Sequence, residues 1–392
     1  MERLLIKNAK IITQNLIVDG SLLALNGRVA ALGVHIEADV DSEIDAKGLF
    51  LSPGFIDIHN HGRMGFDVMD ASVSSLLNIA IEQIKHGVTG FLATTNTAEK
   101  GVLWRAVNVA AEFCDVDRQA ERTANKPRRG AQCLGIYVEG NHISMKKRGS
   151  HPPELLRPIA QENLNTLLSA GKGNIRVMAF APELPGSLDA IRRLRHASVV
   201  AAAAHTDATF DEAMDGINAG VTLAAHTFNS MRAMTHRDPS IIAACLLDDR
   251  VVCEAIADGT HLDPAILQLI YRLKGPDRVC LISDSVRYNG LPDGQYNRDD
   301  GRDVTVKNGV IRLGDGRLAG SSLSMNEAVR NMVRLAGIPL FHAVRMASFV
   351  PSRVIGMDAA KGSLDVGKDA DMILFDEDVN VEAAFIGGKR II

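Results

Sequence analysis

The chain has 392 residues, of which 46% are hydrophobic and 23% are charged. These proportions are typical of a globular protein and exclude a disordered chain. The length suits one large enzyme barrel with an accessory part. Lys and Arg number 43 against 47 Asp and Glu, a formal charge of −4, and there is a single Trp. Such a chain has neither the basic field nor the stacking surface that would attract nucleic acid, and no bulk charge for an anionic membrane.

The five cysteines form no CxxC pair, and most stand in apolar runs. We therefore expect buried thiols in a reducing compartment rather than disulfides. The first residues, MERLLIKNAKII, mix charges with short apolar runs, which is not the pattern of a signal peptide. The most apolar stretch, 198–208, is too short to span a bilayer. These features predict a cytoplasmic protein without a membrane segment.

Both ends of the chain are predicted to consist of short strands and turns. In residues 1–53, Asn26-Gly27 lies between two apolar runs and is the strongest local hairpin signal. Residues 355–392 have the same texture. We expect these two ends to form one small β-sandwich domain beside a different central domain, residues 54–354. Another hairpin is predicted over 303–313, where Asn308-Gly309 forms the turn.

The central domain is predicted to be a (β/α)8 TIM barrel. Continuous apolar runs recur with helical segments between them, and such runs are typical of parallel strands buried on both faces. Eight repeats over about 250 residues indicate a barrel. A doubly wound sheet is the alternative, disfavoured because no glycine-rich phosphate loop follows the first strand. The eight runs are 55–62, 89–95, 133–141, 175–183, 198–207, 221–229, 250–259 and 278–285.

Polar residues collect at the ends of these predicted strands, where a barrel has its active site. Strand alternation places His59 and His61 on one face, and imidazole and carboxylate ligands suit zinc, iron or manganese. A lone histidine in an apolar strand is more often a hydrogen-bonded core residue. Several histidines and carboxylates at the strand ends of one barrel instead favour a metal site. The residues concerned are His59, His61, Glu139, His205, His226, Asp258, His261 and Asp284.

The order of these residues resembles the amidohydrolase superfamily. The segments VEGNHISMKKRGSHPPEL, AHTFNSMRAMTHRDP, IADGTHLDP and SDSVRYNGLPDGQY narrow the resemblance to the N-acetylhexosamine-6-phosphate deacetylases, which act on glucosamine or galactosamine derivatives. The resemblance extends over nearly the whole chain. GSHPPEL and the intact His-Asn-His are more similar to the galactosamine branch.

The resemblance implies a role for each site residue, with Asp284 as the catalytic acid and base. It also implies one or two divalent ions per subunit (zinc first, with iron, manganese or cobalt as alternatives), a phosphorylated amino sugar as ligand, and a homodimer. The metal ligands that match are Glu139, His205 and His226, with His59 and His61 as a pair that holds a second ion in some members. The matching sugar and phosphate contacts are Ser150, His151, Asn229, Ser230, Arg237, Asp258, Gly259, Thr260, His261, Leu318, Ala319 and Gly320.

These roles agree with the chemistry of amide hydrolysis. A metal lowers the pKa of a bound water to about 7, and Asp284 would take a proton from this water and return it to the departing sugar amine. His151 would help to stabilise the developing oxyanion. Arg237 has a planar fork suited to phosphate oxygens.

Two segments depart from the family pattern beside the expected catalytic centre. Asn141-His142 stands where the family has Pro and an aromatic residue, and Arg287 and Tyr288 follow Asp284 where the family has small residues. We expect His142, Arg287 and Tyr288 to influence the choice of substrate, with the galactosamine epimer as the first candidate. A further metal ligand and a solvent-exposed loop histidine are the alternatives for His142.

Two other functions compete with deacetylation of a sugar phosphate. The first is hydrolysis of a different amide or of a modified amino sugar. The predicted fourth strand, IRVMAFAPE, has no lysine, which weighs against a cyclic-amide enzyme that would bridge two metals with a carboxylated lysine. The second is a non-catalytic protein that binds a sugar phosphate. Asp284 weighs against it, because a binding protein needs no general base.

Overall fold

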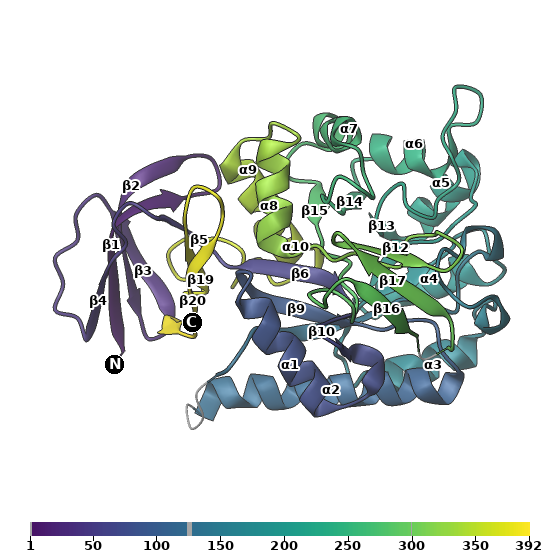
Figure 1. The fold of residues 1–392 in the computed structure, drawn as a ribbon, viewed down its shortest axis with the longest axis horizontal. Coiled ribbons are helices and arrows are strands. Elements are labelled where there is room, and N and C mark those ends of the chain that lie inside the picture. Colours follow the sequence, from purple (N-terminus) through teal and green to yellow (C-terminus); the bar gives the residue numbers. More distant parts are fainter. Residues whose placement is uncertain (1, 124–127, 299) are drawn as a thin grey trace.

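The computed structural model describes residues 2–123, 128–298 and 300–392. A sheet built from both chain ends lies beside a barrel surrounded by helices (Figure 1). Strand β5 (Phe50–Pro53) of the first part leads into β6 (Phe55–Asn60) of the second through the single residue Gly54. A Cβ atom at Gly54 would lie 2.2 Å from side-chain atoms of Thr89. Only glycine therefore fits at this junction without movement of the barrel.

The terminal sheet joins strands from the two ends of the chain, as the sequence predicted. Its order is β21-β20-β19-β5-β1-β2-β3, with β4 paired to β1. The predicted turn at Asn26-Gly27 joins β2 to β3, and both residues have left-handed backbone, with φ of 52° and 82°. Side chains such as Ile6, Leu51 and Phe385 line one buried core. The strands are β1 (Arg3–Ile12), β2 (Ile17–Leu25), β3 (Arg28–Gly33), β4 (Ser42–Asp45), β19 (Met372–Phe375), β20 (Val381–Ile386) and β21 (Lys389–Arg390).

The central part confirms the predicted barrel. Eight parallel strands follow one another in the order β15-β14-β13-β12-β11-β10-β9-β6. The backbone N–H of Asp284 donates to the His59 carbonyl at 3.0 Å, and that of His61 donates to the Ser285 carbonyl at 2.8 Å, so the last strand meets the first. Besides β6, the strands are β9 (Val88–Thr94), β10 (Gln132–Val138), β11 (Ile175–Phe180), β12 (Val200–Ala203), β13 (Val221–Ala224), β14 (Val252–Ala255) and β15 (Val279–Leu281).

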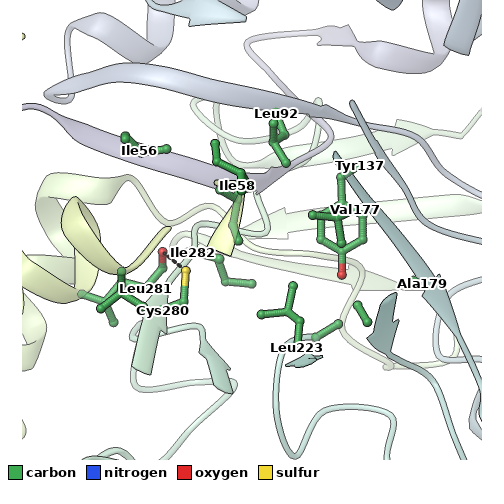
Figure 2. Packing of buried hydrophobic residues seen from close by; sticks show 14 of the residues in the cluster. Ile56, Ile58, Leu92, Tyr137, Val177, Ala179, Leu223, Cys280, Leu281 and Ile282 are labelled. Carbon is green, nitrogen blue, oxygen red and sulfur yellow. Dashed lines mark hydrogen bonds between the residues drawn. The ribbon is translucent and has the colours of Figure 1, made fainter. Parts of the chain in front are cut away.

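The barrel interior is filled by side chains rather than by solvent. Ile58, Tyr137, Val177 and Leu223 come from four different strands and pack in one buried cluster, seen from close by in Figure 2. All five cysteines are free and buried, which confirms the expectation from their apolar surroundings. Within the described part of the chain, no helix combines the length and apolar character needed to cross a membrane.

Helices cover the outside of the barrel (Figure 1). Helix α5 shows why they begin where they do: the Thr209 side chain accepts from the Glu212 backbone N–H while Glu212 returns a bond, a capping box that satisfies exposed donors of the first turn. The helices are α1 (Val73–Ile84), α2 (Lys100–Thr123), α3 (Gln161–Ala170), α4 (Ser187–His196), α5 (Phe210–Ala219), α6 (Ser240–Leu247), α7 (Pro264–Lys274), α8 (Met325–Arg334), α9 (Leu340–Ala347) and α10 (Phe349–Val354).

Two small strand pairings lie outside these sheets. The predicted hairpin over 303–313 is present as β17 (Asp303–Lys307) and β18 (Val310–Leu313), and β16 (Gly294–Asn297) extends it to three strands. Strands β7 (Gly62–Arg63) and β8 (Phe66–Asp67) form a short pair directly after β6. Both pairings follow the carboxyl ends of barrel strands, where they surround the site described next.

Candidate metal centre and active site

Polar side chains meet where the barrel strands end. His59 lies near the end of β6, Glu139 directly follows β10, and His205, His226 and Asp284 follow β12, β13 and β15. The backbone at the last three is left-handed, with φ of 44° at His205, 28° at His226 and 49° at Asp284. Such a backbone at non-glycine residues costs about 1–3 kcal/mol each and persists only where the surrounding structure enforces it. The placement of these three side chains therefore lowers the stability of the folded protein.

Glu139 is the centre of this cluster and is only 2% exposed. Its Oε1 atom lies 3.0 Å from Nε2 of His226 and 3.5 Å from Nε2 of both His59 and His205. Its Oε2 atom lies 3.4 Å from Nε2 of His61. Four imidazole rings from three chain segments thus present the same ring nitrogen to one carboxylate.

His151 and Asp284 complete the cluster from two sides. Nε2 of His151 is 3.3 Å from Nε2 of His205 and 3.7 Å from Oε2 of Glu139. Oδ1 of Asp284 is 3.3 Å from Nε2 of His61. The Asp284 side chain is 13% exposed, whereas the Glu139 side chain is 3% exposed. Asp284 is therefore the carboxylate that a substrate entering the barrel mouth reaches first.

Three of the rings are held in place through their other nitrogen. Nδ1 of His59 is 2.9 Å from Oε2 of Glu254, Nδ1 of His205 is 3.0 Å from the Lys147 carbonyl, and Nδ1 of His151 is 2.7 Å from Oγ1 of Thr97. A ring that donates Nδ1–H to an acceptor carries its lone pair on Nε2. The carboxylate and the carbonyl thus leave the Nε2 lone pairs of His59 and His205 directed at Glu139.

The cluster keeps its carboxylates ionised although they are buried. Burial opposes the charge of Glu139, but while the rings are protonated the charge of His59 and hydrogen bonds from the rings outweigh burial and hold the Glu139 pKa well below its usual range. At Asp284, burial is likewise outweighed by the hydrogen bond with His61 and by nearby rings, which lower its pKa to about 2. Both groups are therefore ionised at neutral pH and attract a cation.

The cluster fits a divalent metal ion. His59, His61 and Glu139 present ligand atoms within 4.8 Å of one another, and so do Glu139, His151 and His205. Nε2 of His59 is buried and has no hydrogen-bond partner among the described residues, and two Nε2 atoms of the second triad face each other. A cation would satisfy these buried ring nitrogens. Nitrogen and oxygen ligands suit zinc and the other first-row transition metals. The two triads share Glu139, so the residues provide for one ion or two.

The segment with Ser150 and His151 lies against the metal cluster. A Cβ atom at Gly149 would come within 2.8 Å of Oγ of Ser230 and 3.0 Å of Cε1 of His205, so the backbone there packs directly on both. The Ser150 carbonyl accepts from Arg302 at 2.7 Å, which ties this segment to the β16–β18 insertion. The structure thus brings together Ser150, His151 and Ser230 of the predicted substrate contacts.

The segment Leu318-Ala319-Gly320 borders Asp284. The N–H of Ser321 donates to the Asp284 carbonyl at 2.8 Å. A Cβ atom at Gly320, where φ is +71°, would lie 2.3 Å from Val286 and 3.2 Å from the Asp284 carbonyl oxygen. This close approach explains the glycine and places the segment at the barrel mouth, as expected.

The remaining predicted contacts lie on the loops after β13 and β14. Asp258 organises its own loop, because Oδ1 accepts from the N–H of Thr260 and of His261 while Oδ2 lies 2.6 Å from Nδ1 of His261; Gly259 within it has φ of 73°. Asn229 is partly exposed and its amide lies 3.4 Å from the Thr227 carbonyl. Arg237 is exposed, and within the described residues it has no ion pair with an acidic side chain.

The structure places the three expected specificity residues outside the metal cluster. The His142 ring is 4% exposed, stacks with Phe180 and donates from Nδ1 to the Arg157 carbonyl at 3.0 Å. It lines a small pocket with Trp104 of α2, so neither the expected approach to the sugar nor the exposed alternative is seen. Arg287 forms ion pairs with Asp67 and Asp70.

Tyr288 also differs from the expectation. It is 5% exposed, packs in the apolar core of the β16–β18 insertion and donates to the Asn297 carbonyl at 3.2 Å. The physical reason is that this core buries the aromatic ring beside Val304, Val306 and Ile311 and supplies an acceptor for the hydroxyl group. The sequence suggested that Arg287 and Tyr288 add bulk to the substrate pocket. In the structure both residues instead anchor neighbouring elements.

Two acidic residues of the site were missed by the sequence analysis. Glu254 on β14 holds His59, and Asp57 on β6 accepts from Oγ of Ser283 at 2.6 Å and supports the segment that carries Asp284. Burial raises the pKa of Asp57 to about 6. The available signal was a carboxylate inside an otherwise apolar strand, because such a residue is costly to bury without a partner.

The comparison with known proteins agrees with this geometry. The sequence profile of the Amidohydrolase family matches residues 50–391. The chain belongs to the amidohydrolase family. The N-acetylgalactosamine-6-phosphate deacetylase of Escherichia coli O157:H7 is 36% identical to it over 371 residues, 95% of this chain and 94% of that one. The N-acetylglucosamine-6-phosphate deacetylase of Bacillus subtilis (strain 168) is also 36% identical, over 97% of this chain and 95% of that one.

A solved structure adds to the same conclusion. A mutant of N-acetyl-D-glucosamine-6-phosphate deacetylase from Mycobacterium smegmatis, in complex with N-acetyl-D-glucosamine-6-phosphate, superposes with a TM-score of 0.90 at 32% identity and covers 100% of both chains. The resemblance to N-acetylhexosamine-6-phosphate deacetylases expected from the motifs is confirmed. Because relatives named for the two epimers are equally similar, overall identity does not distinguish them.

Proposed function

We propose that this amidohydrolase removes the acetyl group from an N-acetyl amino sugar 6-phosphate and releases acetate and the amino sugar 6-phosphate. The observation that carries the proposal is the position of Asp284, 3.3 Å from His61 and beside the buried cluster around Glu139. An ionised carboxylate next to a candidate metal site, at the mouth of a barrel, is the arrangement that hydrolysis of an unactivated amide requires.

The residues divide the work of hydrolysis among them. Glu139, His205 and His226 would hold a divalent ion, with His59 and His61 on the adjoining side. When bound, such an ion lowers the pKa of a water and polarises a carbonyl oxygen. Asp284 takes a proton from the attacking water while the water oxygen bonds to the amide carbon. It then gives that proton to the nitrogen as the carbon–nitrogen bond breaks, so the amine leaves in neutral form.

The sugar and its phosphate would be bound by the surrounding loops. His151 lies beside the cluster and is suited to contact the acetamide oxygen, since its Nε2 faces the cluster interior. We propose Arg237 and His261 as the phosphate-holding residues; Arg237 is unpaired with acidic groups among the described residues and can turn its guanidinium to a phosphate. The galactosamine epimer is the substrate to test first, and zinc is the first ion to test. The homodimer and the cytoplasmic location stay predictions.

A deacetylation screen tests the proposal. Purified protein is assayed with both N-acetylhexosamine epimers, each with and without the 6-phosphate, before and after chelation and after Zn²⁺ is added back. We expect turnover of a phosphorylated substrate that chelation removes and Zn²⁺ restores. Protein that binds these sugars without releasing acetate under any metal condition would show that the site is a binding site only.

A further inference from the structure

Glu254 is a carboxylate in the wall of the barrel. It lies on β14, is 0% exposed, and its Oε2 atom accepts from two groups: Nδ1 of His59 at 2.9 Å and the backbone N–H of His226 at 3.0 Å. Its other oxygen, Oε1, is buried without a partner in the described part of the chain. A carboxylate at such a place is destabilising relative to an apolar side chain of the same size. Packing alone therefore gives no reason for its presence.

From this geometry we propose that Glu254 is the positioning residue that makes His59 a metal ligand. The inference rests on the proposed metal-dependent function and concerns how the chain secures the ion. Glu254 does not reach the centre itself; it acts through the His59 ring, whose Nε2 atom is 3.5 Å from Oε1 of Glu139.

The tautomer of His59 follows from the group that faces its Nδ1 atom. Oε2 of Glu254 already accepts the backbone N–H of His226, so it acts as an acceptor towards the ring as well and His59 donates Nδ1–H to it. The lone pair is then on Nε2, which faces Glu139 and has no hydrogen-bond donor opposite it. With the opposite tautomer, Nε2–H would point into the cluster and the ring could not bind a cation. Glu254 thus excludes the tautomer that cannot act as a ligand.

The groups that face the Nδ1 atoms of the four rings differ in charge. His205 has a neutral acceptor, the Lys147 carbonyl, and the Nδ1 atoms of His61 and His226 have no partner among the described residues. Within that group, His59 is the ring with a carboxylate behind it. A carboxylate makes the ligating nitrogen more basic and fixes the ring plane, and loss of such a partner typically lowers metal affinity 10- to 100-fold.

Glu254 also links β6 to β13. Because the same Oε2 atom accepts from the backbone of His226, one carboxylate sets the distance between the β6 side and the β13 side of the cluster. Both histidines face Oε1 of Glu139, at 3.5 Å and 3.0 Å. Glu254 therefore supports the two rings that approach the same oxygen of the central carboxylate.

The test compares Glu254→Gln and Glu254→Ala with the wild type and with Asp371→Asn. Asp371 is a matched control: it is a buried carboxylate, 7% exposed, that pairs with Lys361 in the terminal sheet and contacts no residue of the cluster. Each protein is stripped with chelator and titrated with Zn²⁺ against a competing chelator. Bound Zn²⁺ per chain is measured in parallel, and Co²⁺ absorption spectra report the coordination of the ion.

We expect Zn²⁺ affinity to fall 10- to 100-fold in Glu254→Ala and to fall less in Glu254→Gln, whose amide oxygen still accepts Nδ1–H but carries no charge. The Co²⁺ spectrum should change in both. Asp371→Asn should keep wild-type affinity and spectrum even if its melting temperature falls. We also expect kcat to fall with little change in KM for the Glu254 variants, since Glu254 contacts no predicted sugar-binding residue.

Two outcomes would overturn the inference. Zn²⁺ affinity and Co²⁺ spectra within twofold of the wild type in both Glu254 variants would show that His59 is placed without Glu254. Affinity that falls equally in Asp371→Asn would show a general effect of lost stability. If the wild-type protein itself takes up no metal, the proposed function is contradicted as well. If the wild type binds metal and the Glu254 variants bind it equally well, only the role of Glu254 is contradicted.

Discussion

The burial of His142 predicts a specific dependence of stability on pH. Its ring is 4% exposed, and burial lowers its pKa from 6.5 to about 4, although the hydrogen bond with the Arg157 carbonyl acts the other way. The unfolded chain therefore binds a proton at a higher pH than the folded chain does. Stability from the neutral ring is complete above pH 6.5 and is lost as the pH falls towards 4.

The size of the effect follows from the shift. A pKa difference of about 2.5 corresponds to about 3 kcal/mol of unfolding free energy, of which about 2 kcal/mol is lost by pH 5. His142→Asn removes the titration, while the amide N–H can still donate to the Arg157 carbonyl. The difference in unfolding free energy between wild type and variant should therefore shift by about 2 kcal/mol in favour of the variant between pH 7 and pH 5.

Urea unfolding of chelated protein at pH 7, 6 and 5 measures this difference without a contribution from metal binding. Trp104, the single tryptophan, lines the same pocket as His142 and provides the fluorescence signal. His236→Asn, a change at an exposed loop histidine, serves as the control and should follow the wild type. If the difference in unfolding free energy between the wild type and His142→Asn is constant from pH 7 to pH 5, the reasoning is refuted. Because the ring lies away from the cluster, we also expect His142→Asn to leave the ratio of kcat/KM for the two epimers unchanged within twofold.

Four further substitutions test the site. Asp284→Asn should lower kcat by about 10²–10⁴-fold with metal content unchanged; near-normal turnover would exclude Asp284 as the acid and base. Glu139→Ala should lose metal and activity together, measured by metal analysis after dialysis, and full retention of metal would contradict its central role. Arg237→Ala should lower kcat/KM for a phosphorylated substrate about 10- to 100-fold, since a charge-assisted contact is worth about 1.5–3 kcal/mol, and an equal loss with the unphosphorylated sugar would argue against a phosphate contact. Gly320→Ala should lower both the melting temperature and kcat, because the new Cβ atom would lie 2.3 Å from Val286 beside Asp284; an unaltered kcat would show that the segment adapts without moving Asp284.

The sequence predicts the barrel and most of the cluster because both depend on local patterns. Each apolar run overlaps one barrel strand, and the polar residues that end these runs converge since parallel strands share one carboxyl edge. Glu254 was missed because it lies inside a run rather than at its end. Its partner, the His59 ring, is 195 residues away in the chain, and no local pattern shows that pairing.

The specificity residues show a different limit of sequence reasoning. Tyr288 packs against Val304, Val306 and Ile311 of the β16–β18 insertion, residues that come later in the chain, and no local pattern shows this packing. His142 is three residues past Glu139 in the chain but faces Trp104 on the helical side. Proximity in sequence was therefore a poor guide once the chain had left the strand.

The position of the site at the junction of β6 and β15 has a consequence for biosynthesis. His59 and His61 are made early, whereas Asp284, whose N–H bonds to the His59 carbonyl, is made more than 200 residues later. A nascent chain on the ribosome therefore cannot assemble the catalytic centre until its last barrel strand has emerged, and the terminal sheet must wait for β19 and β20. A premature stop or a proteolytic cut that removes the later strands yields a protein without a catalytic centre, not one with altered specificity.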